Sequence, residues 1–345
     1  MDIKKAVEEV LLGHDLKIDE MRKVMTQIMS GEATDSQIGG FLVGLRIKGE
    51  TVDEIIGAAQ IMRELSLTLN IDSQNLVDIV GTGGDEACIF NVSTASIFVA
   101  AAAGANVAKH GNRGVSSKSG SADLLEFAGI NLNLSEQQIL SCVKEVGIGF
   151  MFAVNHHAAM KYAVGPRREL GIRSIFNLLG PLTNPANVRN MVLGVYDKKW
   201  LRPLAEVMKK LGGKNILVVH SLDGLDEISI SADTRVAELK NNKISEYSIS
   251  PEDFGMRRGN LNDLRVTNPK ESLELIKSAL TKQAVISAKV EAASDMIAMN
   301  AGAALYVSGV AKDLKEGVIL AQDSIGSGLA KEKISELVSF TNCFN

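Results

Sequence analysis

The chain has 345 residues, of which 46% are hydrophobic and only 4% aromatic, and its formal net charge is −4. This length exceeds the usual size of one domain, so we expect two domains. The acidic balance argues against nucleic acid as a partner, because nucleic-acid-binding proteins usually present a basic face. The most apolar run, residues 97–108, is too short to cross a bilayer, so no membrane partner is expected either.

The cysteines are Cys88, Cys142 and Cys343, which are odd in number and widely separated. They lack the Cys-x-x-Cys spacing of a structural zinc site and do not suggest a disulfide framework. Such cysteine usage fits a reducing compartment, and we expect a cytoplasmic protein.

Residues 1 to about 70 are predicted to form a small all-helical domain. Apolar residues recur between Ile38 and Leu45 with the spacing of an amphipathic helix. Thr51 and Glu54 form a capping-box pattern that opens another helix. The glycines in the range 39–44 would let a second helix approach closely, either within the chain or from another subunit.

From residue 71 onward, short β-rich runs alternate with helical patterns. Strands are expected at 77–80, 106–109, 191–195, 216–219, 236–239 and 244–247, and helices at 93–103, 122–128, 200–211, 271–280 and 290–307. The predicted fold class is therefore α/β, with the small helical domain followed by a larger domain in which helices flank a central, mostly parallel sheet. The larger domain is assigned residues 71–161 and 187–345.

Residues 162–186 interrupt this alternation. Their Pro and Gly breaks are Gly165-Pro166, Gly180-Pro181 and Asn184-Pro185. We expect part of this segment to return to the helical domain or to form a hinge against it.

The run Gly81-Thr82-Gly83-Gly84-Asp85 follows the first predicted strand. It matches neither the dinucleotide fingerprint G-x-G-x-x-G nor a Walker A loop, and alone it is as compatible with a tight turn as with a phosphate loop. Asn91, Ser93 and Thr94 stand at the head of the next predicted helix, with Ser93 or Thr94 expected as N-cap. Side-chain oxygens and a helix N-terminus would then converge with the glycine loop on one anion.

A second polar stretch runs from Lys109 to Asp123. It contains Lys109-His110-Gly111-Asn112-Arg113 and Ser117-Lys118-Ser119-Gly120-Ser121. A solvated loop is the default interpretation of an isolated charge run. Here Gly, Asn and Ser separate the cations, and a Lys at a strand end beside a glycine turn can neutralise a pyrophosphate group.

Asp226 and Glu227 follow the strand predicted at 216–219. Adjacent carboxylates in a loop are usually only solvated. Beside a polyphosphate site, however, they are suitable ligands for Mg²⁺, which typically takes one or two carboxylates together with substrate oxygens.

Arg167 is a candidate for binding a carboxylate through its guanidinium fork, and a surface ion pair with Glu169 is the alternative. His156 and His157 lack other potential ligands at metal-site spacing. We expect these histidines to be packed or hydrogen-bonded.

Taken together, these motifs resemble the anthranilate phosphoribosyltransferase family. The resemblance is carried by Gly81–Asp85, Asn91–Thr94, Lys109–Arg113, Ser117–Asp123, Phe176–Pro185, Asp226–Glu227 and Asn300–Tyr306, and it spans nearly the whole chain. It implies transfer of the phosphoribosyl group of phosphoribosyl pyrophosphate to the amine of anthranilate, a step of tryptophan biosynthesis. It also implies Mg²⁺ as cofactor and an active site between a small helical domain and a larger α/β domain.

The resemblance further implies roles for individual residues. Lys109, Asp226 and Glu227 would be catalytic, and Ser93, Asp226 and Glu227 would hold Mg²⁺. Asn112 and Arg167 would face anthranilate, with Arg167 pairing with its carboxylate. The substrate-binding set comprises Gly81, Gly84, Asp85, Asn91, Ser93, Thr94, Lys109, His110, Gly111, Asn112, Arg113, Ser117, Lys118, Ser119, Gly120, Ser121 and Arg167.

Members of this family are typically homodimers that contact through the helical domain, which suits the glycines at 39–44. Ile89 stands where the family usually has a hydroxyl, and we expect altered packing or affinity there, not lost activity. Two alternatives are a pyrimidine nucleoside phosphorylase and a non-catalytic paralogue that binds nucleic acid. The sequence motifs at 109–113 and 117–123, together with Arg167, favour the anthranilate enzyme over the phosphorylase. The acidic composition argues against the nucleic-acid-binding paralogue.

Overall fold

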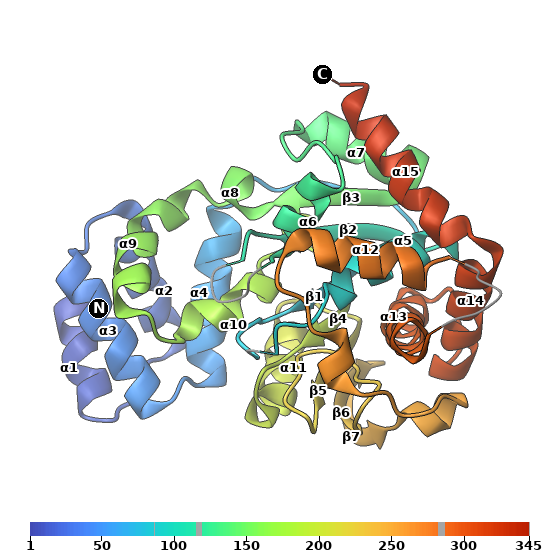
Figure 1. Ribbon diagram of the computed structural model, residues 1–345. Coiled ribbons are helices and arrows are strands. Elements are labelled where there is room, and N and C mark those ends of the chain that lie inside the picture. The colour runs from blue at the N-terminus through green and yellow to red at the C-terminus, as the bar shows by residue number, and fades with distance from the viewer. Residues whose placement is uncertain (86, 115–118, 282–286, 345) are drawn as a thin grey trace.

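The computed structural model describes residues 1–85, 87–114, 119–281 and 287–344. Figure 1 shows two bodies side by side, a small group of helices that begins at the N-terminus and a larger α/β body that carries the C-terminus. This arrangement confirms the predicted fold class.

The helical body is built from α1 (Ile3–Leu11), α2 (Ile18–Ser30), α3 (Asp35–Lys48) and α4 (Val52–Glu64). Helix α4 begins with the predicted capping box, in which Glu54 N donates to Thr51 Oγ1 at 3.3 Å and Thr51 N donates to the Glu54 carboxylate at 2.8 Å. Helix α1 packs on α3, and α2 packs on α4. A Cβ at Gly44 would lie 2.7 Å from the Val10 side chain, so this glycine allows a close contact within the chain.

The chain returns to these helices after the first part of the sheet. Helix α9 (Lys161–Leu170) packs against α2 and α3, and α10 (Ile175–Leu182) packs against α4. The sequence pattern predicts breaks at Pro166 and Pro181, but both prolines lie inside these helices and are buried. Burial of the surrounding apolar faces outweighs the backbone hydrogen bond that each proline removes.

Seven strands form one sheet in the order β3-β2-β1-β4-β5-β6-β7. Their bounds are β1 (Leu76–Gly81), β2 (Asn106–Gly111), β3 (Ile148–Phe152), β4 (Asn190–Gly194), β5 (Asn215–Ser221), β6 (Thr234–Lys240) and β7 (Lys243–Ile249). Strands β1 to β5 are parallel, and β6 and β7 are antiparallel, so the sheet is mostly parallel as predicted. Strand β3 escaped prediction because every residue in it is buried and no polar alternation marks it.

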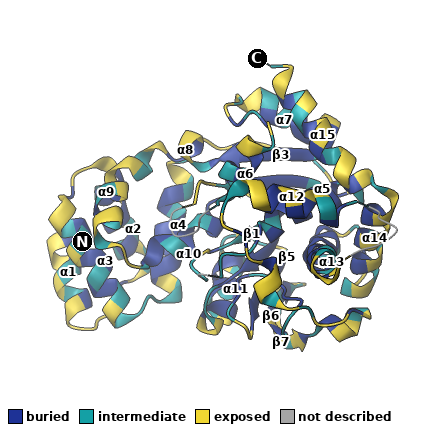
Figure 2. Cartoon of the chain, viewed as in Figure 1, coloured by how far each residue is buried: buried dark blue, intermediate teal, exposed yellow. Residues whose placement is uncertain are grey.

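Helices cover both faces of this sheet. They are α5 (Val92–Ala102), α6 (Ser121–Phe127), α7 (Glu136–Val146), α11 (Leu201–Lys210), α12 (Pro269–Ala279), α13 (Ala288–Ser308), α14 (Leu314–Ser327) and α15 (Leu329–Asn342), with the short helices α8 (Ala153–His156), η1 (Ala158–Met160), η2 (Lys198–Trp200), η3 (Pro251–Phe254) and η4 (Leu261–Leu264). Ile79 and Val107 share a core with α5 and α13, whereas Met191 and Leu193 share one with α11 and the helical body. Figure 2 shows the strands buried between helices whose outer faces are exposed.

The winding of the chain reverses between β1 and β4. Strands β2 and β3 lie on one side of β1, whereas β4 and β5 lie on the other. In open α/β sheets, ligands bind outside the carboxyl ends of the strands at such a switch point. Here those ends are Gly81 and Gly194, which are paired across the two strands.

Candidate active site

Asp226 occupies the switch point directly. A Cβ at Gly81 would lie 2.2 Å from Asp226 Oδ2, and a Cβ at Gly194 would lie 1.6 Å from the Asp226 carbonyl oxygen. Gly83 N donates to Asp226 Oδ2 at 2.7 Å. The glycine loop therefore holds the carboxylate through its backbone, and the missing side chains at both strand ends provide the space.

Glu227 connects this point to helix α5. Ser93 N, in the first turn of α5, donates to Glu227 Oε1 at 3.1 Å. The following residue is fixed by a buried amide of α13, because Asn300 Nδ2 donates to the Ile228 carbonyl at 2.8 Å and Ile228 N donates to Asn300 Oδ1 at 3.0 Å. The loop that carries both acidic residues is thus anchored from two helices.

The start of helix α5 differs from the prediction. The helix begins at Val92, so the N-cap position belongs to Asn91, not to Ser93 or Thr94. The Asn91 Oδ1 atom accepts from the hydroxyls of Ser119 and Ser272 and is not used for capping. Thr94 Oγ1 is buried and has no hydrogen-bond partner in the described part of the chain.

Lys109 extends from strand β2 into the same region and is only 2% exposed. Its Nζ donates to the Ile79 carbonyl at 2.5 Å and lies 3.5 Å from Ser93 Oγ. Burial lowers the pKa of Lys109, while the charges of Asp78, Glu227 and Asp226 favour its protonated form. The ammonium therefore lies next to the Ser93 hydroxyl and interacts electrostatically with Asp226 and Glu227.

The carboxylates concentrate negative charge at this edge of the sheet. Burial raises the pKa of Asp226, and the charge of Asp85 raises it further. Burial and then the charge of Asp226 raise the pKa of Glu227. Burial also raises the pKa of Asp85. The charge of Arg173, which donates to the Gly84 carbonyl, opposes this rise in the pKa of Asp85. The two cations Lys109 and Arg173 do not balance the four carboxylates of Asp78, Asp85, Asp226 and Glu227, so a further cation would relieve their repulsion.

The oxygen donors at this edge suit a hard divalent ion. Within residues 1–85, 87–114, 119–281 and 287–344, no group of three or more His, Cys, Asp or Glu side chains forms a ready metal site. Mg²⁺ does not require one, because it usually keeps several waters and takes one or two carboxylates with substrate oxygens. Ser93, Asp226 and Glu227 provide donors of this kind.

Asn91 joins the loop after β2 to the rest of the site. Its Nδ2 donates to the Ser119 carbonyl at 3.0 Å, and its backbone N donates to Ser272 Oγ, on α12, at 3.0 Å. Tight packing shapes this loop: a Cβ at Gly111 would lie 2.1 Å from Ser121 Oγ, and one at Gly120 would lie 2.3 Å from the backbone N of Gly114.

Arg113 and Asn112 make their contacts away from the acidic pair. The Arg113 guanidinium forms ion pairs with Asp123 at 3.2 Å and Glu126 at 2.7 Å, and it is about half exposed. Asn112 uses its carbonyl to accept from Ala122 N at 3.2 Å. Ser117 and Lys118 lie outside the described residues. Of the predicted loop residues, Ser119 is therefore hydrogen-bonded to Asn91, whereas Arg113 is ion-paired with carboxylates of α6.

His110 and His157 pack against each other, with ring centroids 5.0 Å apart. Both are buried, and burial lowers the pKa of His110 to about 3 and that of His157 to about 4. His156 contacts the Leu67 carbonyl through Nδ1 at 3.1 Å. The histidines are packed, as expected.

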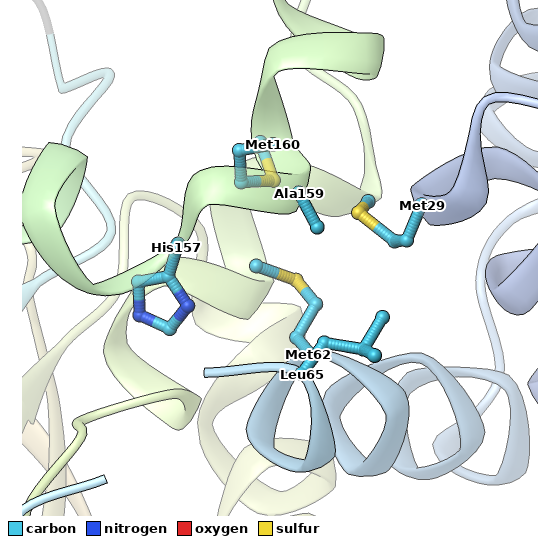
Figure 3. A pocket seen from close by; sticks show the side chains of 6 residues that line it. All are labelled: Met29, Met62, Leu65, His157, Ala159 and Met160. Atoms are coloured by element: carbon cyan, nitrogen blue, oxygen red, sulfur yellow. The ribbon is translucent and has the colours of Figure 1, made fainter. Parts of the chain in front are cut away.

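A small, largely apolar cavity adjoins His157 and is otherwise lined by Met29, Met62, Leu65, Ala159 and Met160 (Figure 3).

Arg167 lies on α9 with its guanidinium 5.0 Å from the centre of the Phe176 ring, on α10. Burial lowers its pKa. No carboxylate in the described part of the chain forms an ion pair with it, so the alternative of a pair with Glu169 is not realised. The stacked, partly buried cation retains its hydrogen-bonding fork for another carboxylate.

Comparison with known proteins decides the family. The a/b domain model of a glycosyl transferase family matches residues 73–331, and the helical bundle domain model matches residues 4–66. An anthranilate phosphoribosyltransferase of Marinomonas sp. (strain MWYL1) is 59% identical over 344 residues, covering 100% of this chain and 98% of the relative. One of Cellvibrio japonicus (strain Ueda107) is 58% identical over 341 residues, covering 99% of each. The chain belongs to the anthranilate phosphoribosyltransferase family.

Solved structures of the anthranilate phosphoribosyltransferase family agree in fold. That of Thermus thermophilus has a TM-score of 0.90 at 40% identity, covering 98% of this chain and 99% of the other. That of Saccharomyces cerevisiae in complex with PRPP and Mg has a TM-score of 0.89 at 25% identity, covering 99% and 98%. The predicted family is confirmed.

The structure adds several residues at this site to those that were assigned a role from the sequence. Asp78, Asn184, Gly194, Ser272 and Asn300 were not assigned a role from sequence, although all contact predicted site residues or their immediate neighbours. A single acidic residue within the apolar strand 76–81 was a visible signal for Asp78. Asn184 and Asn300 lie within the family motifs 176–185 and 300–306, but these motifs did not indicate their contacts. Gly194 and Ser272 carried no local signal, because their partners are distant in sequence.

Ile89 is the residue at which we expect altered packing or affinity. It forms an isolated antiparallel bridge with Arg265, and its half-buried side chain packs against the main core. The position is thus filled by an apolar contact beside the glycine loop.

Proposed function

We propose that this protein transfers the phosphoribosyl group of phosphoribosyl pyrophosphate to the amine of anthranilate, giving N-(5-phosphoribosyl)anthranilate and pyrophosphate. The supporting observation is the buried Lys109 ammonium beside Asp226 and Glu227 at the switch point of the sheet. A site of this kind suits a strongly anionic leaving group that is held by a cation and by bare backbone N–H groups. Relatives that are 56–59% identical carry the name of this enzyme.

The donor set fits Mg²⁺, and we assign Ser93, Asp226 and Glu227 to hold it. The excess of carboxylate charge and the all-oxygen donors support this assignment. When bound, the ion neutralises negative charge on the diphosphate.

The protein's own groups would act on the same leaving group. The Lys109 ammonium would stabilise charge that develops on the diphosphate oxygens as the bond to the sugar breaks. Backbone N–H groups of the loop 81–85, with Asn91, Ser93 and Thr94 at the start of α5, would bind the remaining phosphate oxygens. The loop 110–113 and residues 117–121 would complete the enclosure of the sugar diphosphate.

Arg167 would pair with the anthranilate carboxylate and, with Asn112, orient the amine toward the sugar carbon. An aniline nitrogen is nucleophilic when neutral, so we assign no general base. Orientation of this kind contributes up to about 7–11 kcal/mol in the best intramolecular cases. Positioning and charge stabilisation would therefore carry the catalysis.

We also propose that residues 1–70 and part of 162–186 form one domain, and that 71–161 and 187–345 form the other. The packing of α9 on α2 and α3 supports this division. The shared core of the helical body and the α11 face of the sheet supports a hinge of limited extent.

The helical domain is our proposed homodimer interface. Leu11, Leu12 and Ile47 are 66%, 70% and 78% exposed at neighbouring ends of α1 and α3. A Cβ at Gly39 would meet nothing within 4 Å, so this part of α3 is open to a partner helix. In a size measurement by light scattering we expect a dimer, and Ile47→Glu is expected to give the monomer.

A cytoplasmic location is proposed from the cysteines, which are all free thiols. Among the described residues, every helix is too short or too polar to traverse a bilayer.

The proposed reaction is tested by following the fluorescence of anthranilate with phosphoribosyl pyrophosphate, in the presence and absence of Mg²⁺. Consumption that requires both the sugar diphosphate and the metal is the expected result. Phosphorolysis of thymidine with no consumption of anthranilate would instead identify a nucleoside phosphorylase.

A further inference from the structure

Strands β1 and β2 pair at their amino ends and separate before their carboxyl ends. Their paired residues are Leu76 with Asn106 and Val77 with Val107. Beyond them, β1 stays paired with β4 as far as Gly81, and β2 stays paired with β3 as far as Gly111. The gap thus opens inside a continuous sheet, at the edge where the candidate site lies.

A buried polar pair fills this gap. Asn184, which follows α10, donates from Nδ2 to Asp78 Oδ2 at 2.7 Å and to the Ala108 carbonyl at 2.8 Å. Its Oδ1 accepts from Ala186 N at 2.8 Å, which fixes the orientation of the amide. Asp78 and Asn184 are 0% and 1% exposed. One side-chain amide therefore joins the Asp78 carboxylate on β1 to the backbone of β2.

The separation leaves the Ile79 carbonyl available to Lys109. Asn106 N donates to the Asn75 carbonyl at 3.2 Å, and a regular parallel ladder that continued in this register would direct His110 N to the Ile79 carbonyl. Instead Lys109 Nζ donates to that carbonyl at 2.5 Å. The ammonium takes the place of a strand N–H.

We propose that Asn184 is a positioning residue, which holds Asp78 between β1 and β2 and thereby keeps the Ile79 carbonyl open to the Lys109 ammonium. It touches no substrate and acts through the placement of Nζ beside Ser93. This inference rests on the proposed transfer reaction and adds to it. Without the two donors of Asn184, Asp78 loses its side-chain partner, and the backbone of β2 competes with Lys109 for the carbonyl.

The chain offers a matched control in Asn190. Its Nδ2 donates to the Leu76 carbonyl at 3.0 Å, so it links a neighbouring segment to β1 at the opposite end of the strand. Asn184→Ala and Asn190→Ala each remove a side-chain amide that donates hydrogen bonds to β1. The measurements are kcat, KM for each substrate and Tm for both variants.

For Asn184→Ala we expect kcat to fall at least about tenfold with KM for anthranilate within about twofold of wild type, since the loss concerns charge stabilisation in the transition state. Asn190→Ala is expected to keep kcat within about twofold at a comparable loss of Tm. A kcat for Asn184→Ala that matches that of the control would overturn the proposal.

If Asn184→Ala does not fold, Asn184→Ser replaces it. Serine can still accept from Ala186 N but is too short to reach Asp78 and Ala108 together, so the same fall in kcat is expected, and wild-type kcat would again refute the role. A wild-type enzyme that consumes no anthranilate would be a failure of the proposed reaction, which this comparison separates from a failure of the positioning role.

Discussion

The carboxylate of Asp226 lies where any residue other than glycine at position 81 would place its Cβ, with only 2.2 Å between that Cβ and Oδ2. The two residues are far apart in the sequence and meet at the end of strand β1. The same oxygen accepts from Gly83 N at 2.7 Å, so it has little freedom to move. The geometry of the acidic pair therefore depends on the absence of a side chain at position 81.

Gly81→Ala should displace Asp226 and lower kcat/KM by about 100-fold or more, because misplacing a reacting group by about 1 Å can have an effect of this size. Gly326→Ala is the control. Gly326 is exposed in α14 with nothing within 4 Å of its Cβ position, and alanine there should stabilise the fold by about 0.5–1 kcal/mol without changing turnover. Steady-state kinetics and urea unfolding check both; turnover of Gly81→Ala near wild type would contradict the steric argument.

Lys109→Met and Asp226→Asn should each lower turnover far more than they lower the free energy of unfolding. Burial lowers the pKa of the Lys109 ammonium and raises the pKa of the Asp226 carboxyl. Burying either charged group therefore costs folding free energy, and removing the charge should not greatly destabilise the fold. The expected loss of kcat is at least about 100-fold for a group that stabilises developing charge. Wild-type kcat in either variant would refute its catalytic assignment.

Arg167→Ala should raise KM for anthranilate by about tenfold or more while kcat changes less, because one carboxylate contact is lost. Arg167→Lys should not restore it, since an ammonium cannot reproduce the planar fork. Arg168→Ala, at the exposed neighbouring position, serves as the control and should leave both constants unchanged. An equal KM for the Arg167 and Arg168 variants would show that Arg167 does not bind the substrate.

Gly302→Ala should destabilise the fold without touching the site. A Cβ at Gly302 would lie 2.6 Å from the backbone N of Val318, where α13 and α14 pack together. Helix backbones cannot yield as a flexible side chain would, so we expect a loss of about 1–3 kcal/mol. Chemical unfolding measures it, and stability equal to wild type would mean that the two helices separate at little cost.

Asp295→Asn should stabilise the protein in a pH-dependent way. Burial and then the charge of Glu291 raise the pKa of Asp295 from 3.8 to about 6. Its ionisation therefore destabilises the folded state as pH rises from about 4 to above 6, and this cost is fully present at neutral pH. With a discount for partial exposure, the gain should be about 1 kcal/mol at pH 8 and smaller at pH 5. Urea unfolding that gave equal gains at both pH values would contradict the assignment.

Local patterns in the sequence were sufficient for much of the fold. The capping box at Thr51 and Glu54 predicted the start of α4, and the apolar run before Gly81 predicted β1, because both depend on residues within a few positions of each other. The prolines of α9 and α10 were misleading for the converse reason. Their helices are stabilised by packing against distant segments, and a local sequence pattern does not reveal this stabilisation.

The chemistry of the site followed from residue types and the family motifs, which supplied Lys109, the glycine loop and the acidic pair. Only the tertiary structure showed that Asn184 reaches Asp78 across 106 positions and that Ser272 reaches Asn91 across 181. Any buried polar group needs a partner, but which distant group supplies it depends on how the strands and helices pack. The sequence alone therefore determined the family and the candidate reacting groups, and the folded chain decided what holds each of these groups in place.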